Sequence, residues 1–229
     1  METKLAKLAN VFIGVYLIIT AILVVAEMFQ ITDMLFAFKP LLLPTLMVIY
    51  YTTSHNKNLI YLISLFFAVC SNIFFLFNQQ TFLLYGLIAF MIYRILSIIL
   101  VLNIVKKIPL LPFIIATLPF AFIFSCLLNL AMGALSNTLF PAIINAILIS
   151  ILAGISLSSY ILDDSRANSW LAISTLLSVV LVCIFVIQKY YFANLVFQPL
   201  SALIFSAAHY TYYKFMLAGE CEAKESDND

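Results

Sequence analysis

The feature that most constrains this sequence is a series of long apolar stretches separated by short polar connections. A helix needs about 20 apolar residues to cross the hydrocarbon core of a bilayer. Eight stretches have about this length, and they are 8–28, 34–51, 59–77, 82–105, 109–132, 139–161, 170–188 and 197–217. The pattern predicts an all-α, polytopic membrane bundle of eight transmembrane helices, formed by one domain over residues 1–217.

The scarcity of charge excludes the main classes of soluble protein. Of 229 residues, 65% are hydrophobic and only 11 basic and 10 acidic side chains are present. Soluble domains have roughly 25% charged residues, so a soluble globular enzyme is excluded. A net charge of +1 with no basic face also excludes a nucleic-acid partner. Because acidic residues crowd the last positions, residues 218–229 are expected to form a disordered acidic tail.

Basic residues in the connections predict the orientation of the spans. In an eight-span chain, both termini and the even-to-odd connections share one side of the membrane. Eight basic residues fall on that side, against Lys189 alone on the other: Lys4, Lys7, Lys57, Lys106, Lys107, Arg166, Lys214 and Lys224. Basic connections favour the cytoplasm, so we expect both termini to be cytoplasmic and the protein to be a multi-pass protein of a bacterial inner (plasma) membrane.

The sequence contains no pattern typical of a metal or cofactor site. Its four cysteines lack the spacing of a zinc site or a disulfide framework, and its two histidines have no acidic or cysteine neighbours at ligand spacing. Glycine-rich phosphate loops and a GxSxG elbow are also missing. We therefore expect no cofactor and no metal.

Six polar residues are expected at membrane depth, between the midplane and the outer face: Glu27, Lys39, Asn72, Arg94, Asn145 and His209. Arg94 lies at the centre of the fourth stretch, where insertion of an unpaired arginine costs about 2.5–3.5 kcal/mol. The first two stretches form a hairpin that brings Glu27 toward Lys39. If all six side chains face inward, they line one polar cavity that opens outward. Interfacial anchoring and interhelical hydrogen bonds are the structural alternatives.

Several of these residues lie in motifs that resemble the YhhN-like family of eight-span proteins, which includes the lysoplasmalogenases. The best match is Ala26-Glu27 followed, after a short connection, by Phe38-Lys39-Pro40-Leu41. Asn72 lies where the family has an aspartate, Arg94 where a histidine is typical, and Asn145 where a tyrosine is common. The likeness extends over roughly residues 8–217 and ends near Ala207-Ala208-His209.

The resemblance implies hydrolysis of the vinyl-ether bond of a lyso-ether phospholipid. This reaction needs an acid that protonates the enol-ether carbon and water that attacks the resulting oxocarbenium ion. Glu27, His209 and Asn72 would occupy catalytic positions, and Lys39, Arg94 and Asn145 would bind the substrate. Two family acids are replaced, however, by Asn72 and by residues near Val182-Cys183.

Three functions are consistent with this sequence. The first is a divergent membrane hydrolase that acts on lyso-ether lipids. The second is a protein of the same fold that binds or senses a membrane lipid without turnover, as the two missing acids favour. The third is a small transporter, for which Arg94 and His209 would serve a proton or anion pathway.

Overall fold

The computed structural model describes residues 2–77, 79–105, 108–190 and 196–226. Within these ranges the chain forms α-helices joined by short connections, with one 3₁₀ turn at Ser136–Thr138. The helices are α1 (Glu2–Met28), α2 (Thr32–Thr53), α3 (Leu59–Phe74), α4 (Gln80–Ile104), α5 (Leu110–Leu135), α6 (Leu139–Leu162), α7 (Arg166–Tyr190) and α8 (Phe197–Ser226).

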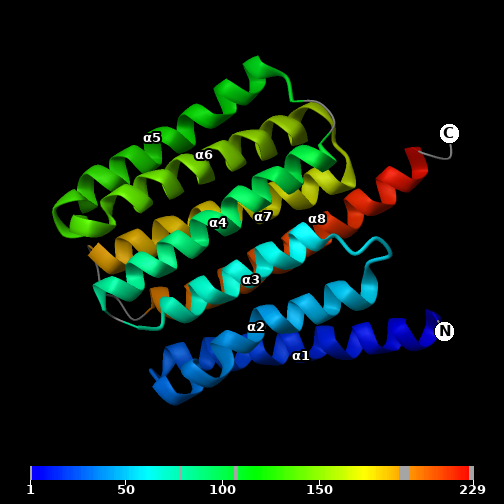
Figure 1. Ribbon diagram of the computed structural model, residues 1–229, viewed down its shortest axis with the longest axis horizontal. Helices are drawn as coiled ribbons and strands as arrows, with labels where there is room; N and C mark the ends of the chain where they lie inside the picture. Colours follow the sequence, from blue (N-terminus) through cyan, green and yellow to red (C-terminus); the bar gives the residue numbers. More distant parts are fainter. Residues whose placement is uncertain (1, 78, 106–107, 191–195, 227–229) are drawn as a thin grey trace.

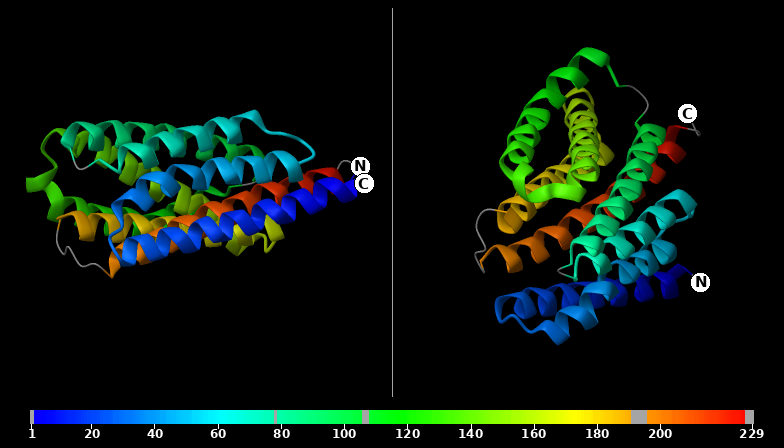
Figure 2. Two further views of the ribbon diagram at one scale, coloured as in Figure 1. Left: turned by 90° about the horizontal axis from the view of Figure 1, so that it is seen from below. Right: turned by 60° about the vertical axis from the view of Figure 1, so that its left-hand side comes forward.

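The helices form an elongated antiparallel bundle. Successive helices pack as the hairpins α1–α2, α3–α4, α5–α6 and α7–α8. The α5–α6 hairpin lies on one side of the bundle and the α1–α2 hairpin on the opposite side, with the remaining helices between them (Figure 1). Both chain ends lie at the same end of the bundle, as a second pair of views also shows (Figure 2). We call this the terminal end.

Six of the helices are long and apolar enough to cross a membrane: α1, α2, α4, α5, α6 and α7. This confirms an all-α bundle of the kind found in membranes. Its outward faces are apolar, as on α5, where Leu111, Ile115, Leu118 and Phe122 are exposed at helical spacing. Membrane crossing by all eight helices stays a prediction.

Two helices do not meet the length and hydropathy expected of a span. The 16 residues of α3 extend about 24 Å, which is less than the hydrocarbon thickness of about 30 Å. Helix α8 is long but carries many hydroxyl-bearing and other polar side chains. It packs against α1, α2 and α7, so most of its polar groups face protein, which removes the need for an apolar surface.

The main core forms where α1, α2, α3 and α8 meet. Tyr50 and Tyr61 pack edge to face with ring centroids 4.6 Å apart, and Leu46 and Phe215 are fully buried beside them. Asn58 begins α3 because its Oδ1 accepts hydrogen bonds from two backbone N–H groups of the first turn. The Tyr16 ring of α1 stacks on that of Tyr210 of α8, with centroids 5.9 Å apart, which sets the depth of α8 relative to α1.

The chain after residue 217 differs from the disordered tail that its composition suggests. Helix α8 continues to Ser226, and its acidic residues bond the terminal end of the bundle. Glu220 accepts hydrogen bonds from the hydroxyls of Tyr50 and Ser54, each at 2.8 Å, and Glu222 accepts the backbone N–H of Ala167 at 3.0 Å. These bonds give the acidic segment partners that composition cannot reveal. Residues 227–229 lie outside the described residues, as do Lys106 and Lys107.

Candidate functional site

Glu27 and Lys39 form an ion pair at the end of the bundle opposite the terminal end. The Lys39 Nζ atom lies 3.2 Å from Glu27 Oε1. Glu27 belongs to the last turn of α1 and Lys39 to the first half of α2, so the tight α1–α2 connection brings them together as the sequence predicts. The side chains are 11% and 28% exposed. The contact thus places a carboxylate and an ammonium group side by side, with the carboxylate the more enclosed of the two.

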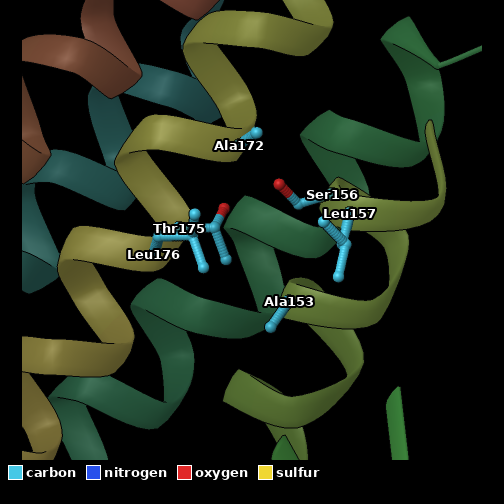
Figure 3. Close-up of a pocket in the computed structure, with 6 residues that line it drawn as sticks. All are labelled: Ala153, Ser156, Leu157, Ala172, Thr175 and Leu176. Carbon is cyan, nitrogen blue, oxygen red and sulfur yellow. The ribbon is translucent and has the colours of Figure 1, made fainter. Parts of the chain in front are cut away.

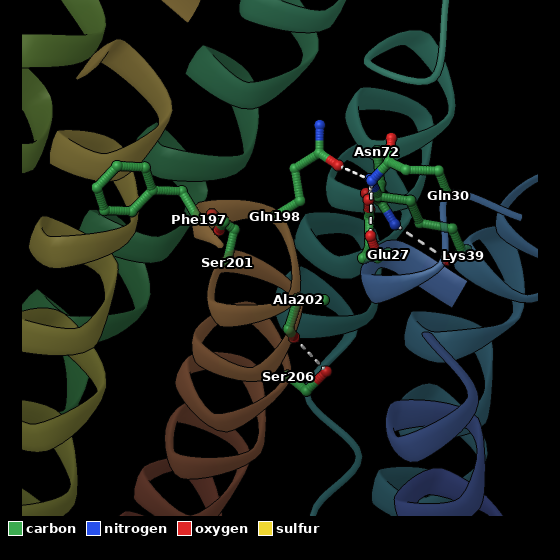
Figure 4. A network of polar contacts seen from close by, with 9 residues as sticks. All are labelled: Glu27, Gln30, Lys39, Asn72, Phe197, Gln198, Ser201, Ala202 and Ser206. Carbon is green, nitrogen blue, oxygen red and sulfur yellow. Dashed lines mark hydrogen bonds and ion pairs between the residues drawn. The ribbon is translucent and has the colours of Figure 1, made fainter. Parts of the chain in front are cut away.

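Asn72 joins this pair through the backbone of α2. Its Nδ2 donates a hydrogen bond to the carbonyl of Lys39 at 3.0 Å, so the amide ties α3 to α2. Nearby, the Gln30 side chain donates to the carbonyl of Glu27 at 2.6 Å and also bonds Gln198 of α8. Figure 4 shows these side chains directed toward one another. We call this group the Glu27 cluster: Glu27, Gln30, Lys39, Asn72 and Gln198.

Arg94 lies in a second polar group, near the middle of α4. It is among the largest fully enclosed side chains, with 2% of its surface exposed. Its guanidinium lies 4.5 Å from the centroid of the Phe90 ring, one turn earlier on the same helix. Within the described part of the chain, Arg94 has no carboxylate partner, and its Nε atom is buried without a hydrogen bond. The structure thus holds a cation whose charge no described side chain neutralises.

His209 of α8 belongs to the same group as Arg94. Its ring packs against Phe205 at 4.5 Å and against Tyr93, the chain neighbour of Arg94, at 5.5 Å between centroids. His209 is 5% exposed, and its Nδ1 has no hydrogen-bond partner among the described residues. We call this group the Arg94 centre: Phe90, Tyr93, Arg94, Phe205 and His209.

The two groups lie at different depths in the bundle. The Tyr16 hydroxyl donates to the Ser206 carbonyl at 2.8 Å, which places Tyr16 of α1 level with the segment of α8 that carries His209. Glu27 follows Tyr16 by eleven residues, or about 16 Å along a helix. His209 follows Gln198 of the Glu27 cluster by the same number of residues. Glu27 and His209 therefore lie too far apart to act on one bond together.

Asn145 belongs to neither group. Its Nδ2 donates to the carbonyl of Leu87 at 3.0 Å and to that of Pro141 at 2.9 Å. The first bond joins α6 to α4, which gives Asn145 a packing role. Its Oδ1 is buried and has no described partner. The six polar residues are thus divided between two groups and a separate helix contact.

A cavity of about 610 Å³ lies elsewhere, at the terminal end of the bundle. It is lined by the ends of α4, α6, α7 and α8, and none of the six polar residues contributes to it. The single outward-opening cavity that the sequence suggests is therefore not formed by this pocket. Its polar lining includes Asp163, Asn168 and Glu222.

Sequence reasoning missed the aromatic side chains and the two glutamines. Phe90 precedes Arg94 by four residues, a spacing that places both on one helix face and could have indicated their contact. Tyr93 and Phe205 come from different helices, and the uniformly apolar sequence gives no signal for their meeting. Gln30 and Gln198 also lie near helix ends, where polar residues are common.

No family model, curated protein or solved structure matches this chain. Among the described residues, no group of three His, Cys, Asp or Glu side chains is placed to hold a metal ion.

Proposed function

We propose that this chain is an eight-span membrane protein, a divergent member of the YhhN-like family, that binds a membrane lipid with an anionic head group. Both termini face the cytoplasm of a bacterial cell in this proposal. The basic residues of the connections support this orientation. The contact between Glu27 and Lys39 supports the family resemblance, because it joins the two halves of the shared motif.

The single observation that carries the binding proposal is the unpaired cation of Arg94. Charged groups inside membrane proteins normally pair with opposite charges or line a pathway, and a buried charge without a partner is strongly destabilising. The Phe90 ring offers a cation–π contact worth about 0.5–2 kcal/mol, which does not neutralise the charge. A phosphate would supply the missing anion through charge-assisted hydrogen bonds.

The aromatic side chains around Arg94 offer apolar surface that suits the hydrocarbon chain of a lysolipid. Phe90, Tyr93 and Phe205 provide apolar ring faces for an acyl or alkenyl chain. His209 packs against Tyr93, the chain neighbour of Arg94, and its buried Nδ1 has no hydrogen-bond partner among the described residues, so it is available to a glycerol hydroxyl or a second phosphate oxygen. The proposed ligand is thus a single-chain phospholipid, with its phosphate at Arg94.

The geometry favours binding over hydrolysis. Vinyl-ether cleavage needs a proton donor beside the reacting carbon, and a positioned acid contributes about 10²–10⁴-fold. Glu27 is paired with Lys39 and lies about 16 Å in depth from His209. Asn72 has an amide that donates to a backbone carbonyl. Neither Glu27 nor Asn72 therefore lies where it could donate a proton to a substrate bound at Arg94.

The test is lipid binding by the purified protein in nanodiscs, measured by native mass spectrometry. We expect lysophospholipid to bind more tightly than a neutral monoacylglycerol of the same chain, and Arg94→Met to remove this preference. Lys214→Met is the matched control, because Lys214 is another cation over aromatic rings, 5.5 Å from those of Tyr210 and Tyr213. Equal binding of the two lipids by the unchanged protein would contradict the proposal.

Vinyl-ether hydrolysis is the second candidate, favoured by the assembly of the Glu27–Lys39 motif. The carbon of the enol ether gains a proton, water adds to the oxocarbenium ion, and the hemiacetal collapses to a fatty aldehyde and a water-soluble glycerophosphodiester that carries no hydrocarbon chain. Release of aldehyde from lysoplasmalogen, lost in Glu27→Gln, would establish this activity. Binding without aldehyde, followed by hydrolysis once Asn72→Asp is introduced, would identify a binding protein on a competent fold.

A further inference from the structure

A small cavity between α6 and α7 is lined by two hydroxyl groups that have no partner. Ser156 Oγ and Thr175 Oγ1 are both buried without a hydrogen bond among the described residues, and each residue is only 2% exposed. They line the same cavity, together with Ala153, Leu157, Ala172 and Leu176. Figure 3 shows both hydroxyl oxygens directed into the gap between the helices.

These two hydroxyls differ from most others in the bundle. A serine or threonine inside a helix ordinarily bonds a carbonyl three or four residues earlier, which satisfies its hydroxyl locally. On α6, Ser150 bonds the carbonyl of Ala146 at 2.8 Å, and on α7, Ser178 bonds that of Ser174 at 2.9 Å. Ser156 and Thr175 do not use this local partner, although both lie within helices. An unmade hydrogen bond in a buried site costs about 1–3 kcal/mol.

The size of the cavity identifies what satisfies the hydroxyls. Its volume is about 10 Å³, close to the minimum of about 10–15 Å³ that one water molecule requires. A buried water also needs about two to four polar partners, and the two hydroxyls supply two of these from opposite helices. The small side chains of Ala153 and Ala172 leave the space open.

We propose that Ser156 and Thr175 bind one ordered water molecule that bridges α6 and α7. The water exchanges hydrogen bonds with both hydroxyls and so joins two helices that otherwise meet here through apolar contacts. This site is independent of the Arg94 centre and of the proposed lipid.

The test compares thermal unfolding of Ser156→Ala, Thr175→Val and the double variant in detergent. With a bridging water, each single change leaves the water and the other hydroxyl short of a partner. Each should therefore lower the melting temperature, by about 2–4 °C for the loss of one hydrogen bond. In the double variant, the decrease in melting temperature should be smaller than the sum of the two single decreases, because no polar group is left in the resulting dry apolar contact.

The opposite result would overturn the proposal. If the cavity is dry, both hydroxyls are unsatisfied in the folded protein, and removing either one raises the melting temperature, with additive effects in the double variant. Ser150→Ala is the matched control, because its hydroxyl is satisfied within α6 and the residue is equally buried. A crystal structure should also show water density within about 2.5–3.2 Å of both oxygens, and empty density there would equally refute the site.

Discussion

At the scale of single residues, Gln30 occupies a backbone conformation that side chains rarely adopt. Its φ angle is 54°, in the left-handed region where glycine usually ends a helix. The N–H of Ile31 bonds the carbonyl of Ala26 at 2.9 Å, which is the bond that closes such a helix end. The side chain compensates for the backbone cost, because it bonds the Glu27 carbonyl and Gln198.

We therefore predict that Gln30→Ala destabilises the protein more than Gln30→Gly. Both changes remove the side-chain bonds, at a cost of about 0.5–1.5 kcal/mol each. Glycine regains about 1 kcal/mol because it tolerates a positive φ, whereas alanine does not. In thermal unfolding in detergent, the unchanged protein should have the highest melting temperature, Gln30→Gly an intermediate one and Gln30→Ala the lowest. Gln79→Ala is the control, since that side chain makes no capping bond, and equal stability of the two Gln30 variants would contradict the argument.

The polar residues show how far single positions could be predicted from sequence. The Glu27–Lys39 pair follows from the chain itself, because a short connection between antiparallel helices must bring their ends together. The separation of Arg94 from Glu27 does not follow, because α4 is apolar on nearly every side and its rotation is not encoded in a hydrophobic face. The depth of His209 depends on the packing of α8 against α1, which joins Tyr16 to Tyr210 and to the Ser206 carbonyl, far apart in sequence.

At the scale of helices, Gly154 of α6 lies directly against Thr117 of α5. A Cβ atom added there would clash with Thr117 Oγ1 and would lie 3.1 Å from the backbone Cα of Thr117. Because the backbone itself is in the way, rotation of the Thr117 side chain alone does not relieve the clash. The absence of a side chain at this position thus sets the separation of the α5–α6 hairpin.

Gly154→Ala should accordingly destabilise the bundle by about 1–3 kcal/mol, the usual range for overpacking. Gly14→Ala is the matched control, since a Cβ on Gly14 of α1 meets nothing within 4 Å, and alanine there should be neutral or slightly stabilising. Chemical unfolding in mixed micelles measures the free energy of unfolding of both variants. A Gly154→Ala variant as stable as Gly14→Ala would show that the hairpin separates without cost.

The end of α8 is anchored by acidic residues. Glu220 accepts hydrogen bonds from Tyr50 and Ser54, at the carboxyl end of α2. Hydrogen bonds to charged groups contribute about 1.5–3 kcal/mol, so Glu220→Ala should loosen the last turns of α8. We expect faster hydrogen exchange over residues 217–226 and little change in Cys221→Ser, whose side chain is exposed. Unchanged exchange in Glu220→Ala would mean that α8 is held here by apolar packing alone.

At the scale of the whole molecule, the number and order of the helices follow from the apolar stretches, and each helix overlaps its predicted stretch. The differences between the predicted stretches and the observed helices are greatest in α8. Its polar composition is compatible with the interior of the bundle because neighbouring helices cover it, and its acidic end is helical because partners exist on α2 and α7. Hydropathy describes the contact of a helix with lipid and gives no information about a helix enclosed by others.

The orientation of the bundle is the last prediction, and it depends on whether α3 and α8 cross the membrane. Both termini lie at one end of the bundle (Figure 1), and the basic residues near that end predict that it faces the cytoplasm. A green fluorescent protein fused to the C-terminus should then fluoresce in a bacterial host, as should one inserted after Asn58. Alkaline phosphatase inserted after Gln79, in the α3–α4 connection, should be active. An active phosphatase at the C-terminus would show that α8 does not cross, because seven spans place the chain ends on opposite sides.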